Sequence, residues 1–358
     1  MSCGVREIVI WAHSECRSTM SLYREVKRLA EVPVTIALWQ HGADAEIRTR
    51  RETTGQGKGE YDDLELVPIG EDMEKGRSLL ATHNGEGAVH VFCVYQVSQV
   101  WRQLIKEAKD CGARVVVYAE APCEMCLGAK AWLKRLYYRF VLPRRVGWVA
   151  RFVDLFLCQS GEVGIDRLLR IGWEKARIVP FGYVSPPLIS RTEEIGDKGR
   201  CERMGGVLRI LHTGVETDYR DIATLLKAVR ILKKAGVVVE LVRTHGGVPL
   251  YELKRLCKWA DVFVACGRCE PWGMRVNDAI HAGLPVIVSD GMGAKMIVEQ
   301  YSCGIVYRAD DARALSDALY RFAKDSALAA NCLEGVVAAH EAWLPAIKAK
   351  MFIKLISS

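Results

Sequence analysis

The chain contains 358 residues, half of them hydrophobic, and 50 lysines and arginines against 43 acids give a formal net charge of +7. This length is too great for one ordinary hydrophobic core, so we expect two domains of roughly 180 residues each. No run approaches the ~20 apolar residues of a membrane-spanning helix, and the first residues lack a signal-peptide core, which predicts a cytoplasmic protein.

Short apolar runs alternate with helical patterns through the first half of the chain. The first run, at residues 6–13, precedes a helix whose apolar face carries Leu22, Val26 and Leu29. Similar runs follow at 34–38, 89–94, 115–118 and 153–158. Alternating β and α elements imply a parallel sheet, so residues 1–183 are predicted to form a Rossmann-like domain. Residues 44–63 are polar and glycine-bearing and are expected to be a surface loop.

A basic segment without acids covers residues 125–153. Its apolar residues recur at helical spacing: Trp132, Leu133, Leu136, Tyr137 and Phe140. Its cations lie between them and beyond: Lys130, Lys134, Arg135, Arg139, Arg144, Arg145 and Arg151. A basic, aromatic, amphipathic helix suits an anionic membrane surface, so Trp132 and the cations from Lys130 to Arg145 are predicted to face lipid. A helix packed on the core with a solvated basic face is the alternative. Binding to nucleic acid is a third explanation of the net positive charge, but the sequence contains no DNA- or RNA-binding module.

The apolar pattern stops between residues 184 and 206, where proline, glycine and charge indicate a linker. A second Rossmann-like domain is predicted over 207–335. It opens with a strand at 207–214, and a helix and the strand VVVELV follow.

The most informative segment covers residues 269–290, CEPWGMRVNDAIHAGLPVIVSD. The apolar run ADVFVAC before it is predicted to be a buried strand, and Gly273 allows close backbone approach before a helix. Glu270 therefore lies at the carboxyl end of a strand, beside a helix N-terminus whose free N–H groups attract phosphate. Asp278 follows about 12 Å further along the helix, at roughly 1.5 Å per residue. Two carboxylates at that separation can hold two hydroxyl-bearing parts of one nucleotide-sugar.

This segment resembles the E-x7-E region of retaining GT-B glycosyltransferases, above all their family 4 group. The resemblance is firm from about residue 207 to 310 and only topological before that. It implies an α/β protein of the GT-B type, with two Rossmann-like domains facing each other across a cleft. It also implies that residues 336–358 form a helix that crosses back to the first domain. The packing face of that helix is expected to carry Trp343, Ile347, Met351 and Leu355.

The resemblance assigns the donor site by position. Glu270 contacts the transferred sugar, Asp278 holds the ribose, and the backbone of Gly273, Met274 and Arg275 meets the diphosphate. Asp278 is one methylene shorter than the glutamate of the family pattern.

The turn after the first strand of the second domain supplies further donor contacts in the family. Gly214 is kept there, Val215 replaces a phosphate-binding arginine, and Arg220 falls where the family has a lysine. A solvated cation at a helix start is the alternative for Arg220. Arg243 and Thr244, at the end of a predicted strand, are expected to flank the base.

The first domain is expected to supply the acceptor side of the cleft. His13 and Arg17 follow its first strand and are candidates for contacts to the acceptor or a phosphate. Glu120 ends the strand within VVVYAEAP and is a candidate catalytic carboxylate that orients the acceptor hydroxyl or takes its proton. A structural histidine and an ordinary polar strand end are the alternatives for these two positions.

Two CxxC pairs, Cys123 with Cys126 and Cys266 with Cys269, each have the spacing of half a zinc site. The pairs are about 140 residues apart, whereas local zinc modules close within a few tens of residues. Buried reduced thiols are therefore predicted in preference to a shared metal, and no metal or other cofactor is expected.

The resemblance implies transfer of a hexose from a UDP- or GDP-sugar to a glycan or lipid-linked glycan, with retention of configuration, in cell-surface polysaccharide or lipopolysaccharide synthesis. The protein is then expected in the cytoplasm or peripherally at the inner face of the cell membrane, with no nucleic-acid partner. A catalytically silent GT-B protein that binds a nucleotide-sugar or glycan in an assembly complex is the alternative, because Val215 and Asp278 depart from the pattern. An epimerase of related fold is a second enzymatic alternative, which the EPWG context disfavours.

Overall fold

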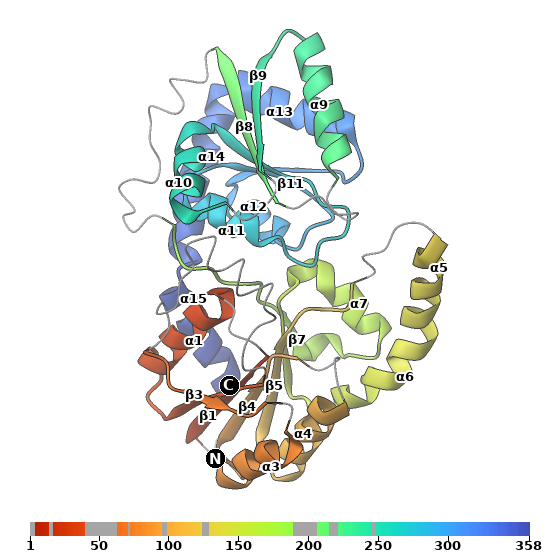
Figure 1. The fold of residues 1–358 in the computed structure, drawn as a ribbon, viewed down its shortest axis with the longest axis vertical. Helices are drawn as coiled ribbons and strands as arrows, with labels where there is room; N and C mark the ends of the chain where they lie inside the picture. Colours follow the sequence, from red (N-terminus) through yellow and green to blue (C-terminus); the bar gives the residue numbers. More distant parts are fainter. Residues whose placement is uncertain are drawn as a thin grey trace.

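The computed structural model describes residues 4–13, 17–39, 63–70, 72–94, 99–123, 129–188, 206–214, 221–244 and 248–358. Within them, each half of the chain forms a parallel sheet covered by helices on both faces, and the two halves are stacked along the long axis of the molecule (Figure 1). The predicted α/β fold of two Rossmann-like domains is confirmed. Residues 44–62 of the predicted surface loop lie outside the described residues, as do Cys126, Val215 and Arg220.

The sheet of the N-terminal domain has the strand order β3-β2-β1-β4-β5-β6-β7. Its strands are β1 (Glu7–Ala12), β2 (Val34–Leu38), β3 (Leu66–Pro68), β4 (Ala88–Phe92), β5 (Arg114–Ala119), β6 (Leu155–Cys158) and β7 (Ile178–Pro180). Successive residues of β1 point to opposite faces, so Val9 and Trp11 join one buried cluster while Ile8 and Ile10 join another. Burial on both faces explains why these strands are continuous apolar runs in the sequence.

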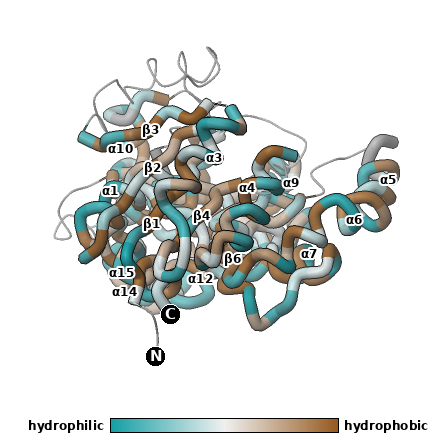
Figure 2. Tube along the Cα trace, turned by 90° about the horizontal axis from the view of Figure 1, so that it is seen from below, coloured by the Kyte–Doolittle hydropathy of each residue, from teal (hydrophilic) through white to brown (hydrophobic). Residues whose placement is uncertain are grey.

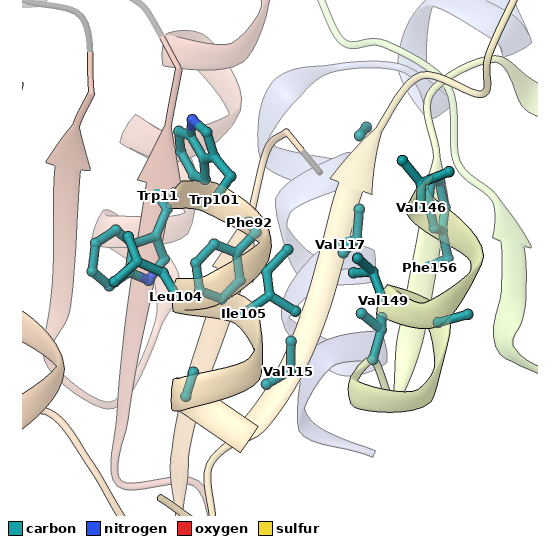
Figure 3. Packing of buried hydrophobic residues seen from close by; sticks show 14 of the residues in the cluster. Trp11, Phe92, Trp101, Leu104, Ile105, Val115, Val117, Val146, Val149 and Phe156 are labelled. Atoms are coloured by element: carbon teal, nitrogen blue, oxygen red, sulfur yellow. The ribbon is translucent and has the colours of Figure 1, made fainter. Parts of the chain in front are cut away.

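Helices α3 (Met73–Thr82) and α4 (Gln99–Asp110) cover one face of this sheet. Figure 3 shows Trp101, Leu104 and Ile105 of α4 lying against Trp11 and Phe92 of the sheet. The rings of Trp11 and Phe92 are stacked at 5.3 Å between centroids, and Trp101 meets Phe92 edge-on at 6.1 Å. These large aromatic side chains fill the interface at the offset and edge-on geometries that aromatic pairs prefer.

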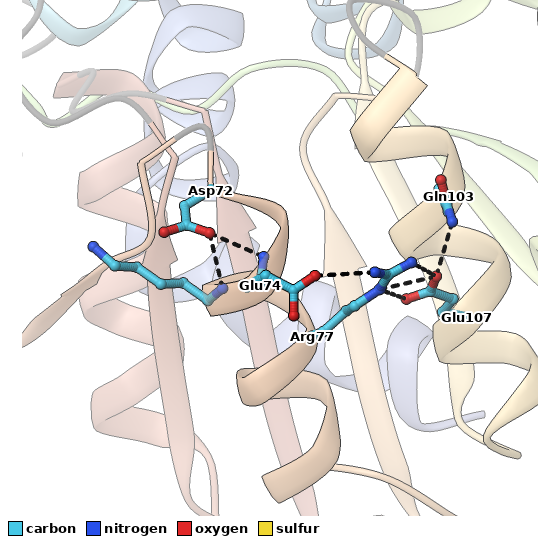
Figure 4. Close-up of polar contacts among 6 residues, drawn as sticks. Asp72, Glu74, Arg77, Gln103 and Glu107 are labelled. Atoms are coloured by element: carbon cyan, nitrogen blue, oxygen red, sulfur yellow. Dashed lines mark hydrogen bonds and ion pairs between the residues drawn. The ribbon is translucent and has the colours of Figure 1, made fainter.

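An arginine joins the outer surfaces of the same two helices (Figure 4). Arg77 of α3 donates to Glu107 of α4 at 2.9 Å and to Glu74 at 3.1 Å, while Asp72 caps α3 by accepting from the Glu74 N–H at 2.9 Å. The cluster is exposed, so its ion pairs are screened by water, and the aromatic core beneath it dominates the packing of α3 on α4.

The remaining helical segments of this domain follow the central strands. They are α1 (Arg17–Leu29), α5 (Ala129–Leu136), a π-helical turn (Tyr137–Val141), α6 (Leu142–Val146), α7 (Ile165–Arg170) and three short 3-10 turns (Gly147–Phe152, Gly161–Gly164 and Lys175–Arg177). Residues 129–146, named the arm below, extend away from the rest of the domain at one side of the molecule (Figures 1 and 2). Leu142 and Val146 join the core at the base of the arm.

The sheet of the C-terminal domain has the order β12-β11-β10-β8-β9, again with parallel pairs. Its strands are β8 (Val207–Thr213), β9 (Val238–Thr244), β10 (Val262–Ala265), β11 (Val286–Ser289) and β12 (Gly304–Tyr307). One face is covered by α9 (Ile222–Lys234) and α13 (Ala312–Lys324). The other is covered by α10 (Leu250–Trp259), α11 (Met274–His281), α12 (Lys295–Tyr301) and most of α14 (Ser326–Ala342).

The last helix, α15 (Pro345–Ser357), leaves the C-terminal domain and packs against α1 of the N-terminal domain, as Figure 1 shows. Its packing face differs from the predicted one: Ala349, Phe352 and Ile356 are buried, whereas Ile347 and Met351 are 45% and 42% exposed. Four-residue steps from Trp343 give the predicted face only if one helix is continuous. Trp343 is the C-cap of α14, and a new helix starts at Pro345, so residues after the break face other directions than the count from Trp343 gives.

A buried lysine lies where α15 begins. Lys348 donates to the carbonyl of Phe181 at 2.9 Å, and its ammonium lies 3.9 Å and 4.1 Å from the ring centroids of Phe181 and Trp343. Burial lowers the pKa of Lys348 to about 7, against the pull of the two ring faces, which favour the charged form. The ammonium therefore joins the two domains through contacts to residues 181 and 343.

The free energy of unfolding is expected to rise between about pH 7 and pH 9 through Lys348. In that range the unfolded chain keeps the lysine proton while the folded chain releases it, so each rise in pH favours the folded state, by at most about 1.4 kcal/mol per pH unit. In Lys348→Met this part of the slope is lost, whereas Lys350→Met, at an exposed position of the same helix, keeps it. Urea unfolding at pH 7, 8 and 9 measures the slopes, and a native slope in Lys348→Met contradicts the prediction.

Candidate active site between the two domains

Glu270 lies in the loop that joins β10 to α11. Its backbone pairs with Met292 in a parallel bridge, and the Gly293 N–H donates to the Glu270 carbonyl at 3.3 Å. Gly273 is the N-cap of α11, with φ 100° and ψ 65°, a left-handed conformation that L side chains rarely adopt. A Cβ at this glycine would also lie 2.3 Å from Met292 Cε. The strand, the acid, the glycine turn and the helix N-terminus therefore have the predicted order.

The second acid of the segment is paired within its own helix. Arg275 Nη1 donates to Asp278 Oδ2 at 3.1 Å, and the carboxylate is 13% exposed while the guanidinium is 41% exposed. The residues predicted to meet the ribose and the diphosphate therefore contact each other. Met274 and Arg275 form the first turn of α11, where the unpaired N–H groups point away from the helix.

A carboxylate of the N-terminal domain faces this loop. Glu120 follows β5 directly, and its Oε1 accepts from the Tyr183 hydroxyl at 2.9 Å. Burial raises the pKa of Glu120, the Tyr183 hydrogen bond opposes this, and the negative charge of Glu270 raises the pKa further. The structure thus brings the two predicted catalytic carboxylates from opposite domains into electrostatic contact.

Cysteines from both domains meet beside Glu270. Cys123 Sγ lies 3.4 Å from Cys269 Sγ and donates to the Cys269 carbonyl at 3.0 Å. Arg167 of α7 donates from Nη2 to Cys269 Sγ at 3.0 Å. The sequence prediction treated the two CxxC pairs as distant, but the fold of the two domains places one thiol of each pair together. No group of three or more His, Cys, Asp or Glu residues within the described ranges is placed to hold a metal ion.

The other predicted site residues lie at the carboxyl edges of the two sheets. Gly214 follows β8, with φ 142°, and its N–H donates to the Thr244 carbonyl at 3.1 Å. Arg243 is the second-last residue of β9 and is half-buried. His13 follows β1, the strand that pairs with β4 beside β5, so it shares an edge with Glu120. Arg17 is the first residue of α1, and only its backbone is described.

Three residues near Glu270 were not predicted as site residues. Tyr183 binds Glu120, and its carbonyl accepts from Asn277 of α11 at 3.1 Å, so it connects both domains. Arg167 reaches Cys269 from α7. Arg268 pairs with Asp221 at 2.7 Å and also with Asp310. Each contact joins residues more than 40 positions apart, and no local pattern in the sequence signals it.

Comparisons with known proteins agree with this fold. Residues 238–335, which include Glu270 and Asp278, match the family model of glycosyl transferases group 1. Anabaena HepE, solved in complex with UDP and glucose, is 12% identical with a TM-score of 0.62, covering 98% of this chain and 99% of that chain. Sucrose-phosphate synthase from Thermosynechococcus elongatus is 13% identical with a TM-score of 0.62, covering 98% of both chains. The apo form of the lipopolysaccharide outer core galactosyltransferase WaaB is 9% identical with a TM-score of 0.63, covering 98% of this chain and 99% of that chain. No curated protein gave a significant match.

Two parallel α/β domains with a last helix that returns to the first of them define the GT-B fold. Residues 238–335 of the C-terminal domain match the model of group 1 glycosyltransferases, and together with the fold this match bears out the resemblance seen in the sequence. Within the described residues, no helix has the length and apolar character needed to cross a membrane.

Proposed function

We propose that the protein is a retaining hexosyltransferase that uses a nucleotide-diphosphate sugar as donor and a glycan or lipid-linked glycan as acceptor. The observation that carries this proposal is the position of Glu270, which lies in the loop just before the N-cap of α11 and whose charge acts on Glu120 of the other domain. The complexes of HepE with UDP and glucose and of TarM with UDP and a GlcNAc-glycerol lend support.

We assign a role to each part of the site. The unpaired N–H groups of the first turn of α11 and the partly exposed Arg275 offer positive charge where the leaving diphosphate gains negative charge. Glu270 accepts hydrogen bonds from hydroxyls of the transferred sugar. Glu120, whose pKa is raised, is suited to take a proton from the acceptor hydroxyl. No step in this scheme requires a metal ion.

Donor turnover tests the proposal. Isothermal titration with UDP-sugars and GDP-sugars measures binding, and an assay for free nucleotide in the presence of glycan acceptors measures transfer. Binding followed by nucleotide release that depends on acceptor supports a transferase. Binding without release, unchanged in Glu270→Ala, overturns it and favours the silent nucleotide-sugar-binding partner. The ion pair between Arg275 and Asp278 favours that alternative, because it engages the carboxylate that was predicted to hold the ribose.

We also propose that the arm contacts an anionic membrane surface. Its apolar stripe does not pack on the core: Trp132 is 57% exposed and Phe140 is 50% exposed, and Leu133, Leu136 and Tyr137 are exposed beside them. Arg144 and Arg145 lie next to this stripe, and Figure 2 shows hydrophobic and hydrophilic residues alternating along the arm. The side chain of Lys130 lies outside the described residues. Apolar insertion and attraction to anionic lipid are the two contributions that hold a protein at such a surface.

Liposome flotation is expected to depend on the arm. The double variant Arg144→Glu/Arg145→Glu is expected to lose most of its flotation with anionic vesicles, because each basic residue near the surface contributes about 1 kcal/mol. Lys233→Glu/Lys234→Glu, an equal charge reversal at the exposed end of α9 in the other domain, is the matched control and keeps native flotation. Equal flotation of both double variants and the native chain contradicts membrane contact by the arm.

A further inference from the structure

A cavity of about 530 Å³ opens between the arm and α7, in the N-terminal domain. Four of its described lining residues are arginines and none is acidic. The described lining residues are Pro122, Arg135, Tyr138, Arg139, Arg167, Arg170 and Ile171. The cavity is adjacent to Glu270, because Arg167 binds Cys269, the residue before it.

Arg167, which is half-buried at this cavity, has unused hydrogen-bonding capacity. Among the described residues, Arg167 Nη1 is buried and has no hydrogen-bond partner, while Nη2 donates to the Cys269 thiol, a weak acceptor. A buried, unsatisfied nitrogen of a charged group is destabilising, and an anion within reach removes that penalty. The unpaired Nη1 therefore indicates a ligand that accepts hydrogen bonds and carries negative charge.

The number and kind of cations narrow the ligand further. Four guanidinium groups around one cavity repel each other, and an anion with several charges relieves this repulsion. The planar fork of arginine matches the oxygens of phosphate in bidentate contacts. A cavity of about 530 Å³ also exceeds what one small ion fills, so it has room for a diphosphate with part of the group attached to it.

We propose that this cavity binds a phosphate or diphosphate group of the acceptor, so that the acceptor is a phosphate-bearing molecule whose hydroxyl is presented to Glu120 and Glu270. The assignment of this phosphate to the acceptor rests on the proposed transferase function, whereas binding of an anion by the arginines does not. Arg167 and Arg170 hold the phosphate from α7, and Arg135 and Arg139 hold it from the arm. A phosphate on a lipid and a phosphate on a soluble glycan fit the same cations.

Titration with inorganic pyrophosphate in the presence of saturating UDP tests the cavity by itself, because UDP occupies the donor diphosphate site. We expect pyrophosphate to bind under these conditions and its affinity to fall about tenfold in Arg170→Gln and in Arg167→Gln, as the loss of one charge-assisted contact predicts. Arg170 is exposed, so its variant is expected to fold normally even if Arg167→Gln does not. Arg151→Gln, an exposed arginine of the same domain outside this cavity, is the matched control with unchanged affinity.

Equal pyrophosphate affinity in the native chain and Arg170→Gln, or binding that disappears when UDP is present, overturns the inference. Failure of nucleotide release with intact pyrophosphate binding overturns the proposed transferase function instead and leaves the anion site standing. Vesicles that contain phosphatidic acid distinguish the two sources of phosphate. If the phosphate belongs to a lipid, pyrophosphate and Arg170→Gln both reduce flotation on these vesicles. If it belongs to a soluble acceptor, flotation is unchanged while pyrophosphate still binds.

Discussion

Replacing Glu270 with glutamine is expected to lower the rate of sugar transfer by about 10²- to 10³-fold, the range seen when one stabilising contact to a transition state is removed. In the proposed donor complex the carboxylate accepts two hydrogen bonds from sugar hydroxyls, whereas the amide offers one acceptor and one donor group. In the proposed donor complex the nucleotide contacts α11 and the β8 edge, so affinity for the free nucleotide is expected to stay within about threefold. The loop itself keeps its shape, because its bridge to Met292 uses backbone atoms.

Steady-state transfer rates and titrations with free UDP or GDP measure these two quantities separately. Glu299→Gln is a suitable control, since Glu299 is an exposed acid of α12 in the same domain and pairs with Lys295 of its own helix. A Glu270→Gln protein with native kcat would remove this residue from the chemistry. A large loss of nucleotide affinity with unchanged kcat would place Glu270 against the nucleotide instead of the sugar.

The parts of the fold that the sequence predicted well are those set by local patterns. The buried central strands appear in the sequence as apolar runs of four to seven residues. The order of Glu270, Gly273 and the start of α11 follows from turn and helix-capping preferences within ten residues. The short strands β3, β7 and β12 were not predicted. All three lie at sheet edges and have only three or four residues, too few to show a period.

The parts of the site that could not be predicted depend on how distant segments meet. The contacts of Cys123 with Cys269, of Arg167 with Cys269 and of Tyr183 with Glu120 all join elements that the chain separates by more than 60 residues. The pairing of Arg275 with Asp278 is different, because residues three apart face each other on a helix. That contact was available from the sequence, and it qualifies the role given to Asp278.

Gly182→Ala is expected to have the largest effect on stability, a loss of about 2–5 kcal/mol in the free energy of unfolding, which combines overpacking with left-handed backbone strain. Gly182 lies where the chain leaves β7, with φ +78°. A Cβ there would lie 2.3 Å from Trp272 Cη2 and 2.7 Å from Trp343 Cη2. Both indoles are buried and pack on each other at 5.4 Å between centroids, so neither has room to withdraw.

The chain contains a control that separates these two contributions. Gly236 has nearly the same backbone conformation, φ +79°, and nothing lies within 4 Å of the Cβ that an alanine would add. Gly236→Ala is therefore expected to cost only the backbone strain, about 1–2 kcal/mol. Urea unfolding followed by tryptophan fluorescence measures both variants.

A larger loss in Gly182→Ala shows that the indoles of the C-terminal domain close tightly on the chain leaving the N-terminal sheet. That packing holds Tyr183, and through it Glu120, in place opposite Glu270. Equal losses in the two variants would mean that the indoles yield, and the fixed spacing of the two carboxylates would then need another source.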